Sequence, residues 1–248
     1  MKPDARRVEE LSLNSSAPPG ELHYDGWILR MLRGKAKRAR SVNAVYPSTL
    51  PTARKIAYCE RLYGRAGVPT IFRMTPFSTP GDLDAELERR GYGRFDPTAV
   101  EAATIDPARL VNGHAEPMDL RTWVEAVGEL RGSPPAHRAA HFARIDGMPL
   151  VKLPVAVHEN GKIVATGLAI VEDDSVGLFD IITHGPAQPG GHARAIVASL
   201  LRNAWELGAR YSYLQVQEAN VAARRLYAQF GFEEQYIYWY RGRPGEME

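Results

Sequence analysis

The sequence is short of cysteine, of long apolar segments and of net charge. Its single cysteine, Cys59, excludes a disulfide within the chain and favours a reducing compartment. It contains no run of about 18 apolar residues, so no transmembrane helix is expected. No apolar core follows the N-terminal residues, so no signal peptide is expected. A net charge of +2 favours neither nucleic acid nor a membrane surface as a partner, and together these absences predict a cytoplasmic protein.

What is present is the composition of a folded protein, with 44% hydrophobic and 24% charged residues. The length of 248 residues exceeds one small domain and falls short of two full ones. In the N-terminal half, the composition of residues 13–20 predicts a loop. Hydrophobic spacing predicts strands at 27–32, 39–45 and 71–74. It also predicts a helix at 51–66 and a second helix from Leu83 to a stop at Gly91.

The C-terminal half is predicted to follow the order α-α-β-β-β-α-β-α-β. This order indicates the α/β (α+β) class, with a mixed, mostly antiparallel sheet flanked by helices. Asp119 is the expected N-cap of the first helix, and Asn160-Gly161 predicts a hairpin turn. The expected helices are 119–130, 136–145, 193–207 and 220–230, and the expected strands are 153–157, 163–171, 176–182, 211–216 and 236–240.

A glycine-rich loop separates the strand expected at 176–182 from the helix expected at 193–207. The loop reads Gln188-Pro189-Gly190-Gly191-His192-Ala193. Glycines let the backbone approach a ligand closely, and the amides at a helix N-terminus favour an anion. Taken alone, such a loop is equally typical of an ordinary turn. Its place between a strand and a helix favours the interpretation as a phosphate-binding loop.

An offset of 140 residues aligns the first half with the second. Arg54 then matches Arg194, and Gly91-Tyr92 matches Gly231-Phe232. Pro51 takes the place of Gly191, and proline has no amide hydrogen to donate to an anion. Short α/β patterns also align with themselves by chance. We interpret the first half as a decayed copy that has lost its anion-binding loop and the two leading helices.

The loop and a later segment together resemble the acyl-CoA site of the GNAT N-acetyltransferases. The family loop is Gln/Arg-x-x-Gly-x-Gly/Ala, and Gln188, Gly191 and Ala193 match it. A segment from Asn220 to Tyr227, followed by Gly231-Phe232, has the family's spacing. The resemblance covers residues 114–241 strongly and residues 22–105 weakly. The sequence departs from the family pattern at Gly185, where proline is more usual, and at His192, which is bulkier than the common residue.

The resemblance implies a GNAT-like fold arranged as a tandem with a truncated first copy. The expected parts are an N-terminal segment at 1–21, a degenerate GNAT-like half at 22–110 and a GNAT N-acetyltransferase domain at 111–248. It further implies that the loop amides hold the CoA pyrophosphate and that the strand edge at Ile181, Ile182 and Thr183 pairs with the pantetheine arm. Asn220 is implied to face the same arm, although asparagine is also a common helix N-cap.

Tyr227 is implied to be the general acid that protonates the leaving thiolate. A phenol with a pKa of about 10 suits a thiolate of similar basicity, whereas a tyrosine on an amphipathic helix can also be a plain core residue. Asp180 is our candidate for the general base, because family enzymes often use a carboxylate on the central strand. His184 and Glu218 remain alternatives for that role.

Three further signals have simpler interpretations. His137 and His141, four residues apart on a helix, have the spacing of a metal pair, but no third ligand follows, so we expect no metal. The basic cluster at residues 35–40 is typical of a solvated turn. Cys59 lies on an apolar helical face and is expected in the core.

The resemblance implies an N-acetyltransferase that uses acetyl-CoA as a cosubstrate. The acceptor is expected to be a primary amine of a small molecule or a peptide, acetylated directly in a ternary complex. Residues 119–145 are expected to line its pocket. Two alternatives remain: a non-catalytic acyl-CoA-binding sensor or scaffold, and an interaction protein that uses the basic cluster.

Overall fold

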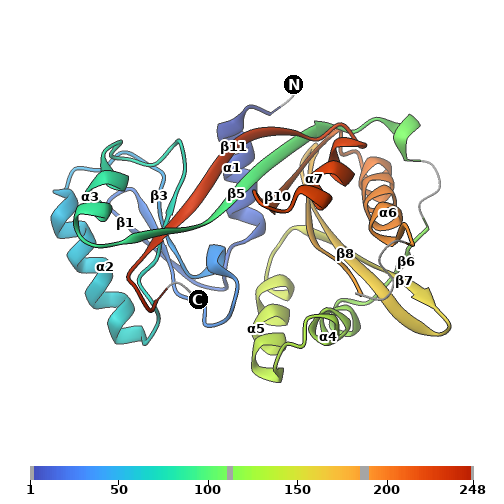
Figure 1. Ribbon diagram of the computed structural model, residues 1–248, viewed down its shortest axis with the longest axis horizontal. Helices are drawn as coiled ribbons and strands as arrows, with labels where there is room; N and C mark the ends of the chain where they lie inside the picture. Colours follow the sequence, from blue (N-terminus) through green and yellow to red (C-terminus); the bar gives the residue numbers. More distant parts are fainter. Residues whose placement is uncertain (1–2, 111–113, 185–189, 247–248) are drawn as a thin grey trace. The chain divides into compact units, whose positions relative to one another are not determined.

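The computed structural model describes residues 3–110, 114–184 and 190–246, which form two compact units (Figure 1). Unit 1 contains the chain up to Ser15 and from Val100 to Gln235, and unit 2 contains Ser16–Ala99 and the chain from Tyr236 onward. Each unit therefore combines two separate stretches of sequence. The division into continuous domains at 1–21, 22–110 and 111–248 stays a prediction.

Unit 2 is a sheet packed against helix α2. The strand order is β1-β2-β3-β4-β11, in which β3 and β4 are parallel. Helix α2 buries Ile56, Cys59 and Tyr63 against the sheet residues Trp27 and Phe72, as expected of an amphipathic helix. The elements of this unit are β1 Glu21–Tyr24, β2 Trp27–Arg30, the 3-10 helix η1 Lys37–Ala39, β3 Val42–Ala44, α2 Thr52–Ala66, β4 Phe72–Met74, α3 Leu83–Arg89, the first part of β5 Gly93–Thr104 and most of β11 Glu233–Gly242.

Unit 1 contains strands in the order β5-β10-β9-β8-β7-β6, with both parallel and antiparallel pairs. Strands β7, β8 and β9 form an antiparallel meander, and β10 runs parallel to β9. The elements are α1 Ala5–Ser15, the end of β5, the 3-10 helix η2 Pro107–Arg109, β6 Glu116–Pro117, α4 Leu120–Leu130, α5 Pro135–Asp146, β7 Val151–Glu159, β8 Lys162–Glu172, β9 Ser175–Thr183, α6 His192–Glu206, β10 Tyr211–Gln217, α7 Val221–Ala228 and the start of β11.

Helices cover both faces of the unit 1 sheet. On one face, Trp123 of α4 and Ile145 of α5 pack with Leu168 of β8. On the other face, Gly167 lies so close to α6 that a Cβ placed there would be 2.3 Å from the Ile196 side chain. Successive residues of a strand point to opposite faces, so β8 is enclosed from both sides in unit 1.

Most of the predicted elements are confirmed, and so is the fold class of a mixed, mostly antiparallel sheet flanked by helices. Helix α4 begins after Asp119, whose carboxylate accepts a hydrogen bond of 2.9 Å from the Thr122 amide. Gly67, with φ of 66°, ends α2. Within the described ranges, no helix is both long and apolar enough to cross a membrane.

Two predictions of local structure were wrong. The strand expected at 39–45 shortens to β3, because residues 37–39 form a 3-10 turn before it. Residues 13–15, expected in a loop, end helix α1. The Tyr213 hydroxyl lies 3.0 Å from the Leu11 carbonyl and 2.9 Å from the Ser15 hydroxyl at the end of α1. These contacts with a distant strand are not visible in the local pattern.

Both halves of the chain repeat the succession β-β-β-α-β-α-β. Strands β1–β3, α2, β4, α3 and β5 correspond to β7–β9, α6, β10, α7 and β11. Helix α2 begins at Thr52 and α6 at His192, which preserves the 140-residue offset. Gly91 and Gly231 follow α3 and α7 with φ of 83° and 85°. This correspondence supports the interpretation of a decayed first copy.

The last strand of each succession lies in the sheet of the other unit. From Tyr236 onward, β11 belongs to unit 2 and pairs antiparallel with β4. From Val100 onward, β5 belongs to unit 1, where its neighbour is β10. Each sheet is thus completed by a strand from the opposite half of the sequence.

Candidate functional site

Strands β9 and β10 part in the middle of unit 1. Their parallel ladder runs from the pair Ser175–Tyr211 to the pair Leu178–Leu214. In the described chain the ladder ends there, although β9 continues to Thr183 and β10 continues past Leu214. The stretch predicted to hold the pantetheine arm, residues 181–183, lies in this continuation of β9.

A β-bulge lies just before that stretch. The register between β8 and β9 shifts there, and Asp180 has a φ of 49°, which is unusual for a residue other than glycine. Bulges re-aim side chains near functional sites. The bulge turns the Asp180 carboxylate toward Arg131 and His141.

The described part of the glycine-rich loop forms the N-terminus of α6. Gly191 is the N-cap residue with φ of 75°, and a glycine has no side chain with which to cap the helix. A Cβ at Gly190 would lie 2.4 Å from the His192 ring, which itself pairs with Glu159 at 3.2 Å. Ala193 follows in the first turn, where helix amides lack intrahelical partners. Gln188 and Pro189 lie outside the described residues.

In unit 2, an acidic side chain takes the corresponding amides. The Asp25 carboxylate accepts hydrogen bonds of 3.0 Å from the Thr49 amide and 2.8 Å from the Leu50 amide. The buried Lys55 ammonium lies 3.3 Å from the same carboxylate and donates to the Asp25 carbonyl. An internal anion therefore stands where the second half is predicted to hold pyrophosphate, and Pro51 offers no amide beside it.

This arrangement predicts an acid-sensitive contribution to stability. The Leu50 and Thr49 amides hold the pKa of Asp25 far below its ordinary value. A carboxylate with a lowered pKa stabilises the fold above the unfolded value of about 3.9, and the stabilisation is lost as the pH falls. We expect Asp25→Asn to lower the Tm at neutral pH, and we expect the difference from wild type to shrink below about pH 4.

Calorimetry over the acidic to neutral range measures this difference. Asp96→Asn is the control, because it breaks the more exposed pair with Lys37 (2.7 Å) and should lower the Tm less. A Tm difference for Asp25→Asn that is constant with pH would contradict the assignment.

Helix α7 presents Asn220 and Tyr227. The Asn220 side chain accepts a hydrogen bond of 3.1 Å from the Ala223 amide. Asn220 is therefore the N-cap of α7, which was the alternative to a residue that faces the pantetheine arm. Tyr227 is 8% exposed and packs edge-on against Phe232. Burial, followed by the nearby charge of Glu101, raises the pKa of Tyr227 to about 12. The phenol is therefore fully protonated at neutral pH.

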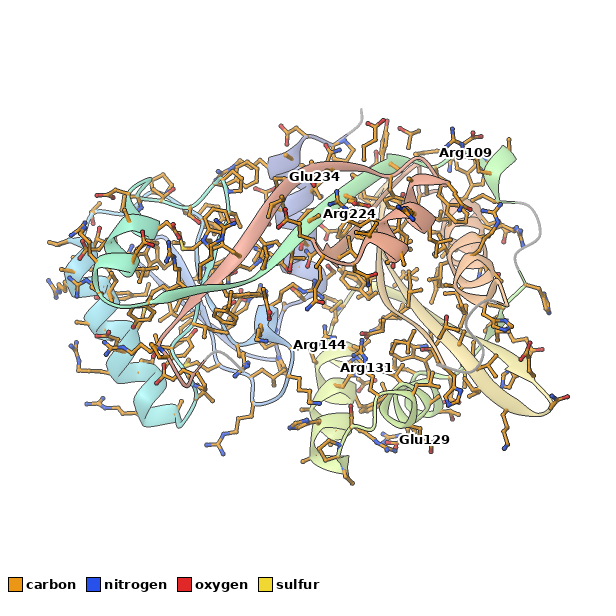
Figure 2. The ribbon with its side chains drawn as sticks, in the orientation of Figure 1. Arg109, Glu129, Arg131, Arg144, Arg224 and Glu234 are labelled. Atoms are coloured by element: carbon orange, nitrogen blue, oxygen red, sulfur yellow. The ribbon has the colours of Figure 1, made fainter. Side chains whose placement is uncertain are left out.

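An arginine links α7 to the two long strands within unit 1. Arg224 donates to Glu101 at 2.7 Å and to Glu234 at 2.8 Å, and Figure 2 shows Arg224 and Glu234 close together. These hydrogen bonds raise the pKa of Arg224. The three side chains line a shallow depression of about 320 Å³ together with Phe232. The pairing fixes the outer face of the helix that carries Tyr227.

Asp180 is mostly buried, and its carboxylate has two nitrogen-bearing partners, Arg131 and His141. Its carboxylate lies 2.6 Å from Arg131 and 3.1 Å from His141. Burial alone would raise the pKa of Asp180, but Arg131 and His141 outweigh it and hold the pKa well below its ordinary value. The alternatives His184 and Glu218 are both exposed.

Sequence reasoning missed Arg131 and gave His141 another interpretation. The spacing of His137 and His141 suggested a metal pair, but no group of three or more potential metal ligands occurs within the described residues. Instead, His141 faces the carboxylate on β9. In the basic cluster, Lys37 pairs with Asp96. Cys59 is fully buried, and burial raises the pKa of its thiol to about 12.

Comparison with known proteins points to one family. Residues 120–232 match the model of the acetyltransferase (GNAT) family. The chain is 26% identical over 239 residues to an uncharacterized N-acetyltransferase, YobR, of Bacillus subtilis (strain 168), covering 92% of this chain and 94% of that protein.

Two solved structures share the fold. A GCN5-related N-acetyltransferase from Kribbella flavida gives a TM-score of 0.66 at 16% identity, covering 99% of this chain and 97% of that one. A tandem GNAT protein from the clavulanic acid biosynthesis pathway gives a TM-score of 0.61 at 14% identity, covering 81% of this chain and 74% of that one.

Proposed function

We propose that the chain is a GNAT-type N-acetyltransferase that moves an acetyl group from acetyl-CoA to a primary amine of a small molecule or a peptide, because residues 120–232 match the model of that family and the relatives are N-acetyltransferases. Enzymes of this family use acetyl-CoA as a cosubstrate. The observation that carries the proposal is the end of the β9–β10 ladder in the same unit as the glycine-capped α6.

Each part of the cosubstrate has a matching group in unit 1. Uncapped amides at the start of α6 suit a pyrophosphate, because they add the positive end of the helix dipole. The backbone of residues 181–183 suits the amides of a pantetheine arm, as an added strand suits a sheet edge. The Asn220 side chain uses its oxygen for the helix cap, which leaves its NH₂ group as the donor toward that arm.

The reaction needs an acid near the leaving sulfur and a polarised thioester carbonyl. Backbone amides of β9 would polarise the carbonyl oxygen. The amine nitrogen forms the new C–N bond, and the C–S bond breaks with its electron pair on sulfur. Tyr227, the buried phenol on α7, gives its proton to that sulfur. Direct transfer is proposed because Cys59, the single cysteine, is fully buried in unit 2.

Two measurements on the full chain test the proposal. Isothermal titration with acetyl-CoA should give one site per chain, because Asp25 already occupies the corresponding amides of unit 2. An amine panel should yield at least one acetylated product by mass spectrometry. Binding without any product would instead support a non-catalytic sensor. Two sites, or one site that persists in Gly191→Pro, would contradict the proposed location.

A further inference from the structure

Three side chains from separate elements meet at the β9 bulge. Arg131, just after α4, donates to Oδ1 of Asp180 at 2.6 Å. His141 of α5 places its Nε2 3.1 Å from Oδ2 of the same carboxylate. The Asp180 and His141 side chains are 15% and 17% exposed, so the pair is largely dry but still reachable. Figure 2 shows Arg131 and Arg144 close together. The charge of Arg144 also acts on the Asp180 carboxylate.

The fold holds both partners in place. Asp180 keeps a left-handed backbone conformation within the bulge, and such conformations concentrate at functional sites. The His141 ring lies 5.8 Å from the fully buried Trp123 ring, measured between centroids. Ile145, one turn further along α5, packs in the same core. The imidazole is therefore fixed by packing on one side and by a carboxylate on the other.

This contact determines which imidazole nitrogen can accept a proton. In a neutral histidine one ring nitrogen carries hydrogen and the other carries a lone pair. A carboxylate at Nε2 favours hydrogen on that nitrogen, which leaves the lone pair on Nδ1. The same arrangement orients the base in hydrolases that use a carboxylate and a histidine. Asp180 itself is bound by Arg131 at one oxygen and His141 at the other, so it is poorly available as a proton acceptor.

We propose that His141 is the general base of the acetyl transfer and that Asp180 is its positioning residue. The inference rests on the proposed function. Asp180 directly precedes residues 181–183, so the imidazole adjoins the strand segment proposed to hold the cosubstrate. His184 and Glu218, the other candidates, are exposed. Among the described residues, His141 contacts the charged Asp180 on β9, and the charges of Arg131 after α4 and Arg144 on α5 act on the same carboxylate.

The proton balance is complete with groups already described. Nδ1 of His141 accepts a proton from the acceptor nitrogen, whose electron pair forms the C–N bond to the acetyl carbon. The C–S bond breaks toward sulfur, which takes the proton of Tyr227. His141 then releases its proton to solvent. Tyr227 takes a proton from solvent, which restores both groups. No oxidant or metal is needed.

Single-turnover acetylation of an amine found with the panel tests the proposal. His141→Gln should lower the rate of the chemical step about 10²-fold, which is typical of a lost general base, with unchanged acetyl-CoA affinity by titration. His158→Gln on β7 is the matched control, because its imidazole also pairs with a carboxylate (Glu116, 3.3 Å) but lies outside residues 119–145, and it should keep the wild-type rate. The wild-type rate should fall as the pH is lowered, because a protonated imidazole cannot accept a proton, and His141→Gln should lose this pH dependence.

Two more variants separate a base from a structural residue. In His141→Ala, added imidazole should restore part of the rate, and His158→Ala should show no such response. Asp180→Asn should change the pH profile of the rate, because the ring loses its carboxylate. A His141→Gln rate within threefold of wild type would overturn the inference while leaving the proposed function intact. A wild-type chain that acetylates no amine would overturn both.

Discussion

Tyr227→Phe is expected to lower kcat by about 10²–10⁴-fold, the usual effect of losing a general acid. The substitution keeps the ring, which is 8% exposed and packs against Phe232 with centroids 6.0 Å apart. It removes only the hydroxyl, with which no described residue forms a hydrogen bond. Acetyl-CoA affinity and Tm should therefore change little.

Steady-state kinetics, titration and thermal melting of the variant measure the three quantities separately. Tyr211→Phe, a partly exposed tyrosine at the start of β10, is the control and should keep wild-type kcat. A Tyr227→Phe kcat within about twofold of wild type means that chemistry is not rate-limiting or does not use this phenol. A pre-steady-state burst distinguishes these two outcomes. Parallel losses of affinity and Tm would identify Tyr227 as a core residue only.

Gly191→Asp is expected to weaken acetyl-CoA binding at least about tenfold, which corresponds to about 1.4 kcal/mol. The new carboxylate would stand at the uncapped N-terminus of α6, where the pyrophosphate is proposed to bind, and like charges at close range repel. No described atom lies within 4 Å of the Gly191 Cβ position, so the new side chain meets no clash there, but the φ of 75° adds backbone strain for any residue other than glycine.

Gly161→Asp is the matched control for backbone strain. Gly161 has a φ of 74°, close to the 75° of Gly191, and its Cβ position is equally open, but it lies in the β7–β8 turn. Titration calorimetry of both variants should show the loss only for Gly191→Asp. Equal affinity in a folded Gly191→Asp variant would place the cosubstrate elsewhere.

Features that depend on neighbouring residues, such as helix ends, could be predicted from the sequence. Helix ends at Asp119 and Gly67 follow from capping preferences, and they are confirmed because a cap depends on residues within one turn. The family resemblance also rested on short-range spacing. The family model matches within the C-terminal half, where that spacing lies.

Contacts between distant segments did not have such a signal. Arg131 and Asp180 are 49 residues apart and meet only because the α4–α5 pair covers β9. Asp25 reaches Leu50 across 25 residues, and neither residue type marks the contact in sequence. A backbone bulge, which changes where Asp180 points, is likewise a property of the paired strands rather than of one segment.

Strands β5 and β11 each end in the unit formed mainly by the other half of the chain, so the order in which the chain is synthesised limits the order in which it can fold. A ribosome releases β11 after every other strand, yet β4 in unit 2 pairs with it. Until then, β4 presents an open edge, which is a template for pairing with another chain. A fragment that ends at residue 110 would keep that edge permanently, and one that begins at residue 111 would lack the β5 neighbour of β10. The N-terminal and C-terminal halves of the chain therefore each need a strand from the other half to complete their strand pairing during folding.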